Sequence, residues 1–263
     1  MRVLPSPCYI IGDTHLGVGP PELERRLITF LRGLPDHAKS LVINGDLFDF
    51  WFEWRTVIPR DHFRTLAALA DLRDGGVDVL MVAGNHDCWG GEFLSREVGL
   101  RYQLGAWEGS VAGWRTRIDH GDGLRAREDR KYRALRRVLR HPLSMRAFRW
   151  LHPDWGTRLA RGSSTASRTY RARDAGAGLR TVAHATLAAR PELDLLVFGH
   201  SHVPALERTA TGSVYANAGS WLDEPTYLVV IPERVELRSW RESAEGHRLD
   251  AIDRRPEKAL AHP

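Results

Sequence analysis

Five short turns carry aspartate, asparagine or histidine directly after an apolar, β-rich run; they lie at residues 12–15, 45–49, 84–87, 120–122 and 199–202. Seven side chains in these turns offer an oxygen or an imidazole nitrogen to a metal ion: Asp13, His15, Asp46, Asn85, His120, His200 and His202. Around two divalent ions about 3.5–4 Å apart, such a set completes two coordination shells if one carboxylate bridges the ions. Because the set contains no cysteine, it favours Mn, Fe or Zn over a soft metal.

The strands that precede these turns must end close together if the turns are to form one site. Apolar runs at residues 8–12, 41–44 and 77–83 alternate with amphipathic stretches at 20–34 and 60–73, which predicts a βαβαβ unit with parallel strands. The strand ends of an open α/β sheet line a common crevice. A single Gly-Asp or Gly-His turn is most often a plain connection, but five in succession favour convergence on one site.

The rest of the chain completes a predicted α/β fold with a mixed or paired sheet core. Residues 102–118 are predicted to form short antiparallel strands, 125–161 a few short helices interrupted by prolines, and 178–190 a longer helix. Closing strands are predicted at residues 193–198, 204–209, 213–216, 226–231 and 234–240. We expect one domain over residues 1–240, a basic helical insertion at 123–180 within it, and a polar, flexible tail at 241–263.

The composition excludes several classes of protein. With 43% hydrophobic and 27% charged residues, the 263-residue chain is globular and not a disordered segment. No apolar run approaches the roughly 20 residues that a membrane-spanning helix needs, and the N-terminus lacks the apolar middle of a signal peptide. Two cysteines, Cys8 and Cys88, cannot make a disulfide framework. We therefore expect a soluble, cytoplasmic protein.

The charge is concentrated in one segment. Residues 125–180 hold 16 basic and 4 acidic residues, a net charge of +12, whereas the remainder holds 22 basic and 29 acidic residues, a net charge of −7. Such an asymmetry predicts a local anionic partner, which could be phosphate, nucleic acid or an anionic membrane surface. The alternative is a set of solvated helix faces without a partner.

The five motifs, in their order along the chain, resemble those of the calcineurin-like metallophosphoesterases. They read Asp-x-His, Gly-Asp-x-x-Asp, Gly-Asn-His-Asp, His-Gly-Asp and Gly-His-x-His, and the resemblance spans residues 10–221. It implies a sandwich of two mixed β-sheets flanked by helices, with in-line attack of a metal-bound hydroxide on phosphorus. It also implies a first metal held by Asp13, His15, Asp46 and His202, and a second held by Asp46, Asn85, His120 and His200.

A further histidine lies in the third motif. The resemblance implies that His86 faces the scissile phosphate as a general acid or charge stabiliser, with Asp87 or Asp49 orienting its ring. The alternative is a structural histidine. Asp122, after His120, is expected to be a carboxylate of the turn and not a ligand.

Three other segments are similar to the UDP-2,3-diacylglucosamine pyrophosphatase family of lipid A biosynthesis. They are the aromatic stretch at residues 46–54, the His-Pro segments near 141 and 152, and Asn-Ala-Gly-Ser-Trp at 217–221. The resemblance implies hydrolysis of UDP-2,3-diacylglucosamine to UMP and 2,3-diacylglucosamine 1-phosphate, with the insertion as a lid over the acyl chains. Expected substrate contacts are Asn85, Trp51, Lys131, Tyr132, Arg136, Arg158, Arg161 and Arg168.

The insertion interleaves arginines with aliphatic side chains at helical spacing, which suits an enzyme that takes a lipid from an anionic inner-membrane surface. This pattern is not an aromatic stacking platform, so we expect no nucleic-acid partner. Many members of the lipid A family carry arginine where this chain has His86. A general phosphoesterase acting on a nucleotide, phosphodiester or phosphoprotein therefore stays open as an alternative, followed by a nuclease and by a non-catalytic scaffold.

Overall fold

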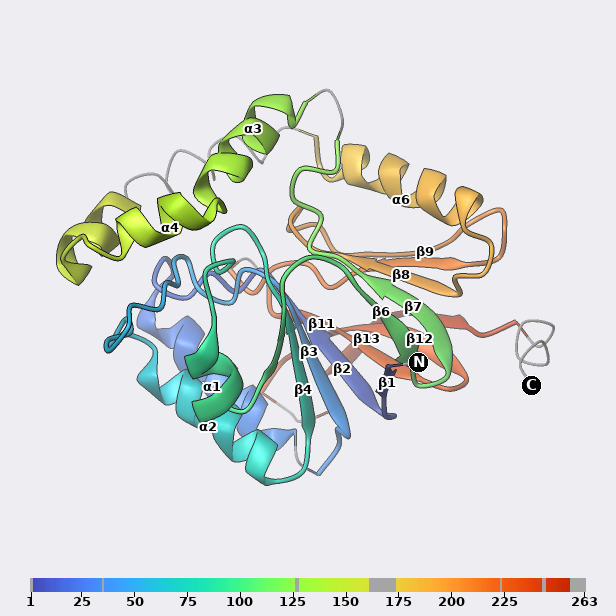
Figure 1. Cartoon of the computed structure of the whole chain (residues 1–263). Helices are drawn as coiled ribbons and strands as arrows, with labels where there is room; N and C mark the ends of the chain where they lie inside the picture. Colours follow the sequence, from blue (N-terminus) through green and yellow to red (C-terminus); the bar gives the residue numbers. More distant parts are fainter. Residues whose placement is uncertain are drawn as a thin grey trace.

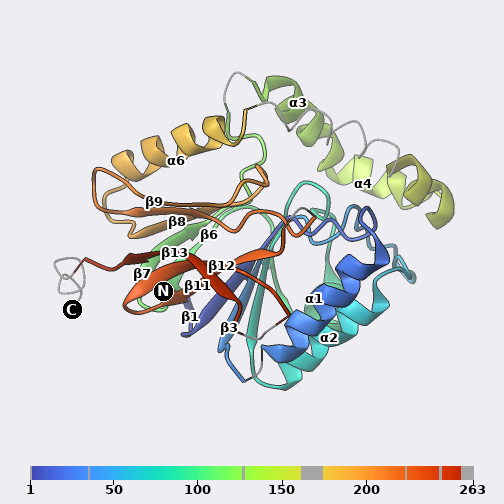
Figure 2. The same ribbon diagram turned by 180° about the vertical axis from the view of Figure 1, so that it is seen from behind.

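Short apolar strands assemble into two mixed β-sheets that pack face to face, with helices on both outer faces (Figure 1). The computed structural model describes residues 2–34, 36–125, 128–160, 174–222, 224–242 and 245–255. In the view from behind, α1 and α2 lie on one outer face and α6 on the other (Figure 2). The α/β sandwich expected from the sequence is confirmed.

The seven-stranded sheet contains the predicted βαβαβ unit. In spatial order its strands are β13 (His247–Asp253), β12 (Arg234–Ser239), β11 (Thr226–Ile231), β2 (Cys8–Ile11), β3 (Ser40–Asn44), β4 (Asp78–Val82) and β5 (Arg101–Gln103). Strands β2 to β5 run parallel to one another, and β11, β12 and β13 pair antiparallel. The antiparallel expectation for residues 102–118 is therefore wrong for β5, because the π-helix η1 (Phe93–Glu97) returns the chain in the direction of β4.

The six-stranded sheet supplies the other strand ends of the site. Its strands in spatial order are β1 (Val3–Leu4), β6 (Trp107–Val111), β7 (Trp114–Ile118), β8 (Leu195–Phe198), β10 (Val214–Asn217) and β9 (Ala205–Arg208). Strands β6 and β7 are antiparallel, as predicted, whereas β7 and β8 are parallel. Because β7 and β8 run in the same direction, the turns that follow them emerge at the same edge.

Three apolar clusters hold the layers together. Helices α1 (Pro21–Gly33) and α2 (Phe63–Asp74) bury residues such as Leu27 and Leu69 against the seven-stranded sheet. A second cluster, which includes Ile10 and Val197, fills the space between the sheets. Helix α6 (Ala177–Ala189) packs on the outer face of the six-stranded sheet, so the end of the predicted insertion belongs to the body of the domain. Burial of apolar surface at about 25 cal/mol per Å² is the main stabilising contribution here.

The C-terminal segment, expected to be a polar and flexible tail, contains a strand that was not predicted. Residues His247–Asp253 form β13, an edge strand paired with β12. Its side chains are mostly exposed, and the strand is held chiefly by backbone hydrogen bonds to β12, with Ile252 packed on the core and Arg248 3.6 Å from Glu236. Residues 243–244 and 256–263 of the predicted tail lie outside the described residues.

The insertion forms an arm of short helices, here called the lid, along the edge of the sandwich where the polar turns lie (Figure 1). It contains α3 (Arg130–Leu139), α4 (Pro142–Phe148) and a helical segment at 153–160. The predicted breaks are confirmed, since Pro142 and Pro153 each begin a new helix. The Arg125 guanidinium pairs with Asp129 and Asp174, both at 3.0 Å, and so ties together the segments that enter and leave the lid.

Candidate metal centre

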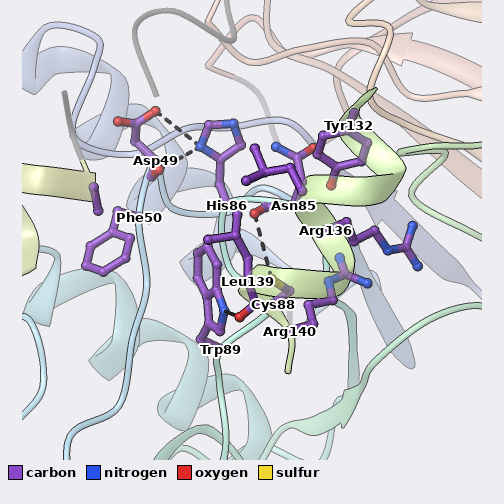
Figure 3. A pocket seen from close by; sticks show the side chains of 12 residues that line it. Asp49, Phe50, Asn85, His86, Cys88, Trp89, Tyr132, Arg136, Leu139 and Arg140 are labelled. Atoms are coloured by element: carbon purple, nitrogen blue, oxygen red, sulfur yellow. Dashed lines mark hydrogen bonds and ion pairs between the residues drawn. The ribbon is translucent and has the colours of Figure 1, made fainter. Parts of the chain in front are cut away.

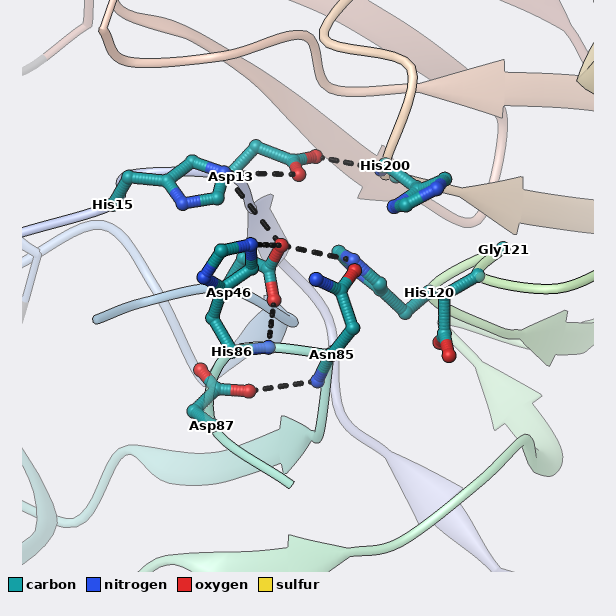
Figure 4. Close-up of polar contacts among 12 residues, drawn as sticks. Asp13, His15, Asp46, Asn85, His86, Asp87, His120, Gly121 and His200 are labelled. Atoms are coloured by element: carbon teal, nitrogen blue, oxygen red, sulfur yellow. Dashed lines mark hydrogen bonds and ion pairs between the residues drawn. The ribbon is translucent and has the colours of Figure 1, made fainter. Parts of the chain in front are cut away.

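The turns after β2 and β3 run side by side and bring the first ligand candidates together. The backbone N–H of Asp13 donates to the Gly45 carbonyl at 3.0 Å, and that of His15 donates to the Asp46 carbonyl at 2.9 Å. The Asp46 Oδ1 atom accepts from the backbone N–H of His86 at 2.9 Å, which fixes the turn after β4 beside them. Figure 4 shows these side chains pointing toward one another and toward His120 and His200 from the other sheet.

The ligand candidates form two adjoining clusters. Asp13, His15 and His202 place one potential ligand atom each within 4.8 Å of one another, and so do Asp46, His120 and His200. The Asp46 Oδ2 atom lies 3.6 Å from His15 Nε2 of the first cluster and 3.3 Å from His120 Nε2 of the second. A carboxylate in that position can bridge two ions.

Several polar atoms at this centre are buried and lack a hydrogen-bond partner in the described part of the chain. Among the described residues, Asp13 Oδ1, Asn85 Oδ1 and His120 Nε2 are shielded from solvent and make no hydrogen bond. The other ring nitrogen of His120, Nδ1, lies 3.0 Å from the Asn44 carbonyl, which orients Nε2 toward the centre. Buried polar atoms rarely go unsatisfied, and this donor set of carboxylate, amide and imidazole fits divalent transition-metal ions.

Backbone conformation also marks the site. Five of the candidate ligands adopt left-handed backbone angles, with φ between 43° and 62°: Asp13, His15, Asp46, His200 and His202. This conformation is unfavourable for residues other than glycine, so the surrounding structure has to enforce it. Gly84 allows the turn after β4 to pack closely against Asp46, because a Cβ at this position would lie 2.2 Å from Asp46 Oδ1.

The electrostatics of the centre favour positive charge. Burial alone would lower the pKa of His120, but the Asp46 carboxylate beside it outweighs burial and raises the pKa to about 10. Burial alone would raise the pKa of Asp13, but His202 holds it down at about 2. The carboxylates of Asp13 and Asp46 therefore stay ionised and attract cations, which is the condition for holding a metal ion.

His86 and Asp49 lie at the open side of the clusters. His86 Nδ1 lies 2.7 Å from the Asp49 carbonyl, and His86 Nε2 lies 3.9 Å from Asp46 Oδ2. The Asp49 carboxylate lies 3.7 Å from His86 Nδ1 and 3.8 Å from His15 Nδ1. Asp49 thus contacts both rings, as expected of a group that orients His86.

Asp87 does not orient His86, contrary to one of the two expectations. Its carboxylate accepts hydrogen bonds from the backbone N–H groups of Leu47, at 2.8 Å, and Gly84, at 2.7 Å. It is fully buried, and burial together with the neighbouring Asp46 raises its pKa to about 7. Asp87 therefore ties the turns after β3 and β4 together.

Some residues that shape the site were not predicted from the sequence. Ser220 Oγ donates to the Asp13 carbonyl at 2.9 Å, and Asn217 Nδ2 donates to the Gly199 carbonyl at 3.0 Å. Both belong to the Asn-Ala-Gly-Ser-Trp segment, whose resemblance to a known motif was the only available signal. Arg140 on the lid was not predicted either, because one arginine among many gives no signal.

Beside His86 lies a cavity of about 150 Å³ between the turns and the lid (Figure 3). Three of the expected substrate contacts line it, namely Asn85, Tyr132 and Arg136. Phe50, Trp89 and Leu139 form its apolar side, and the same three residues also line a second cavity of about 290 Å³. Apart from Ser144, the remaining side chains of that second cavity are apolar: Phe52, Met145, Phe148, Leu159 and Ala160.

The other expected substrate contacts have different outcomes. The expectation for Trp51 is wrong, because its ring has no exposed surface and stacks on Phe48 in the core, with ring centroids 4.6 Å apart. Lys131 and Arg158 are exposed and line neither of the two cavities. Arg161 and Arg168 lie outside the described residues.

Comparison with known proteins identifies the family. A family model described as calcineurin-like phosphoesterase matches residues 6–204. A protein named UDP-2,3-diacylglucosamine hydrolase from Porphyromonas gingivalis is 33% identical over 247 residues, which cover 85% of this chain and 94% of the relative. The chain belongs to the calcineurin-like phosphoesterases, in the UDP-2,3-diacylglucosamine hydrolase family.

A second relative agrees with this assignment. A protein of the same name from Serratia proteamaculans is 29% identical over 233 residues, covering 86% of this phosphoesterase and 96% of the relative. A dimetal phosphatase from Danio rerio with a solved structure is 14% identical in sequence. The match covers 94% of this chain and 97% of the phosphatase, with a TM-score of 0.43. The phosphoesterase is a metal-dependent hydrolase with Asp/His clusters as candidate sites for divalent ions. Among the described residues, none of its helices combines the length and apolar character needed to span a bilayer.

Proposed function

We propose that this phosphoesterase hydrolyses the pyrophosphate of UDP-2,3-diacylglucosamine to UMP and 2,3-diacylglucosamine 1-phosphate. The observation that carries the proposal is the pair of adjoining cavities beside the candidate metal centre. The first presents His86, Asn85 and two arginines, which suit a phosphate group, and the second is almost entirely apolar, which suits an acyl chain. The name of the two relatives, UDP-2,3-diacylglucosamine hydrolase, supports the same substrate.

The proposed metal ligands are the six side chains of the two clusters together with Asn85. One ion would be held by Asp13, His15, Asp46 and His202, and the other by Asp46, Asn85, His120 and His200, with manganese as the proposed metal and iron or zinc as alternatives. Bound divalent ions lower the pKa of water to about 7 and offset negative charge on phosphoryl oxygens.

His86 would act on the substrate directly, whereas other groups hold the metal ligands in place. His86, with Nδ1 held by the Asp49 carbonyl, presents Nε2 toward the centre and would donate a hydrogen bond or proton to the phosphate. Asn44 orients His120, and Ser220 and Asn217 hold the turns that bear Asp13 and His200. These contacts pre-organise the site, so that little rearrangement is needed during the reaction.

We also propose that the lid rests on an anionic, cytoplasmic membrane surface from which the lipid enters. Large apolar side chains on the lid are strongly exposed, with relative exposures of 69% for Leu143, 83% for Trp150 and 72% for Trp155. Arg146 and Arg149 lie on the same helical stretch. Exposed tryptophan together with arginine is typical of surfaces that bind at the interface of a membrane.

The experiment is incubation of the purified, Mn²⁺-loaded protein with UDP-2,3-diacylglucosamine and measurement of UMP release. Unacylated UDP-N-acetylglucosamine and bis-p-nitrophenyl phosphate are the control substrates. We expect the diacylated substrate to have the highest kcat/KM. Fast turnover of the simple diester without UMP release would instead support the general phosphoesterase, the alternative favoured by histidine in place of arginine at position 86.

Membrane binding is tested separately by flotation of the protein with vesicles. Binding to vesicles that contain phosphatidylglycerol, lost when Trp150 and Trp155 are replaced by serine, is the expected result. Equal flotation of the wild type and this variant would contradict a role for the lid tip.

A further inference from the structure

Asp122 connects the candidate metal centre to the lid. It lies two residues after His120 on the turn that follows β7, and its carboxylate is almost completely buried, with 5% relative exposure. Its Oδ2 atom accepts hydrogen bonds from Tyr132 Oη at 2.7 Å, Arg136 Nη1 at 3.0 Å and Arg140 Nη2 at 3.4 Å. All three partners belong to α3 or to the residue that ends it. One carboxylate of the domain body thus holds three side chains of the lid.

Arg140 is anchored on a second turn of the centre as well. Its Nη2 atom lies 3.4 Å from the Gly84 carbonyl, at the start of the turn that bears Asn85 and His86. The Arg140 side chain is only 15% exposed, so its charge is largely removed from bulk water. A buried guanidinium needs charge-assisted partners, and Asp122 provides the only carboxylate that pairs with it among the described residues.

The balance of charge leaves this group of side chains positive. Arg136 and Arg140 share one carboxylate, and both line the cavity that also contains Asn85 and His86 (Figure 3). The other carboxylate lining that cavity, Asp49, lies beside His15 and His86. One positive charge in excess of the shared carboxylate therefore lines this cavity, where it can pair with an anionic oxygen.

We propose that Asp122 is a positioning residue that docks α3 over the metal centre and aims Arg136 and Arg140 at the diphosphate of the substrate. The two guanidinium groups contact the phosphate oxygens that lie away from the metal ions. This inference rests on the proposed function for its substrate. It adds a reason why the lid acts on the reaction and is not merely a cover for acyl chains.

The test compares Asp122→Asn with Asp119→Asn in the Mn²⁺-loaded, full-length protein. Asp119 lies on the other side of His120 and pairs with Arg117 outside the cavity, at 2.9 Å, which makes it a matched control. We expect Asp122→Asn to raise KM for UDP-2,3-diacylglucosamine about tenfold. This is the effect of losing one charge-assisted hydrogen bond between a lid arginine and the diphosphate. Its kcat/KM for bis-p-nitrophenyl phosphate should stay within about twofold of the wild type, since that small diester does not need the lid arginines.

A second set of variants distinguishes positioning from general stability. If Asp122 acts through the arginines, adding Asp122→Asn to an Arg136→Gln, Arg140→Gln double variant should change KM by less than about twofold. A further tenfold loss in that background would overturn the proposal, as would an equal loss on both substrates. The melting temperature of each variant is measured, and the asparagine is isosteric with aspartate so that the fold is retained.

Docking of the lid can be measured without any substrate. Amide hydrogen exchange over residues 130–139 should be faster in Asp122→Asn than in the wild type and unchanged in Asp119→Asn. Equal exchange in all three proteins would overturn the docking. Should the wild type release no UMP at all, the proposed function fails, but faster exchange in Asp122→Asn would still establish Asp122 as the anchor of α3.

Discussion

His15 Nε2 lies 3.1 Å from His202 Nε2, although 187 residues separate them in the sequence. His15 follows β2 of the seven-stranded sheet, and His202 follows β8 of the six-stranded sheet. The two nitrogens converge beside Asp13, whose Oδ1 atom is 3.4 Å from His202 Nε2. A cation bound at this point would therefore join the two sheets.

Removal of metal should lower the stability of the whole domain, because the ligand candidates come from both sheets. In a sample whose free metal concentration is 100 to 1,000 times the dissociation constant, bound metal adds about 3–4 kcal/mol to the free energy of unfolding. We expect a chelator to remove this contribution. Calorimetry before and after chelation, followed by addition of Mn²⁺, measures the change. An unchanged melting temperature would mean that the clusters hold no ion in the native protein.

Asp46→Ala should be the most damaging single substitution at the centre. Its Oδ2 atom is close to both histidine clusters, so the variant loses a ligand to each ion. We expect kcat to fall by more than about 100-fold, together with the metal content. Metal analysis and UMP release are compared with those of His200→Ala, which removes a ligand from one cluster. Retention of two ions per chain by Asp46→Ala would contradict the bridging role.

His86→Ala should separate catalysis from metal binding. His86 lies beside His15 and Asp49 and lines the cavity that is proposed to meet the phosphate, and the proposed ligand set does not include it. We expect kcat to fall about 100-fold with metal content unchanged. His86→Gln serves as the control for loss of side-chain volume. Loss of a metal ion in His86→Ala would show that the histidine is a ligand after all.

Met145→Glu should impair the acylated substrate selectively. Met145 lines the apolar cavity under the lid, so a carboxylate there would face Phe52 and Phe148 without a partner. We expect KM for UDP-2,3-diacylglucosamine to rise at least about tenfold, while turnover of bis-p-nitrophenyl phosphate is unchanged. Met145→Leu, which keeps the cavity apolar, is the control. Equal kinetics of the glutamate and leucine variants would place the acyl chains elsewhere.

Acid should destabilise the domain partly through Glu236 on β12. Burial alone would raise the pKa of Glu236, but hydrogen bonds from Arg234 and Arg238 outweigh burial and hold it below the ordinary value. A lowered folded-state pKa gives stability above the unfolded pKa that is lost as pH falls through the folded pKa. Glu236→Gln should therefore show a shallower loss of melting temperature below pH 4.5, the ordinary pKa of glutamate. Parallel curves for the two proteins would contradict the assignment.

The predictions from sequence succeeded where a local pattern carries the information. The parallel unit and the convergence of Asp13, Asp46 and Asn85 follow from the strand-turn pattern, because side chains after parallel strands share one edge. Strand β13 was missed because its side chains are mostly polar and exposed, so the segment gives little apolar pattern. Trp51 was assigned wrongly because the sequence of an aromatic stretch next to a site does not show which rings face the ligand and which face the core.

The partners in contacts between distant segments could not be predicted from the sequence. The bond from Ser220 to Asp13 spans 207 positions, and the hold of Asp122 on Arg140 depends on where the lid folds back. Left-handed backbone angles at aspartate and histidine were equally hidden, since tertiary contacts impose them against local preference.

The clamp formed by Arg125 has a practical meaning for protein engineering. Because one guanidinium brings Asp129 and Asp174 together, the two cut points of the lid are neighbours in space. The segment between Asp129 and Asp174 is therefore a natural unit to exchange, with the two ion pairs of Arg125 kept at its ends. Transplanting lids of different apolar content that keep Tyr132, Arg136 and Arg140 should then change the length of lipid accepted while the metal ligands stay in place.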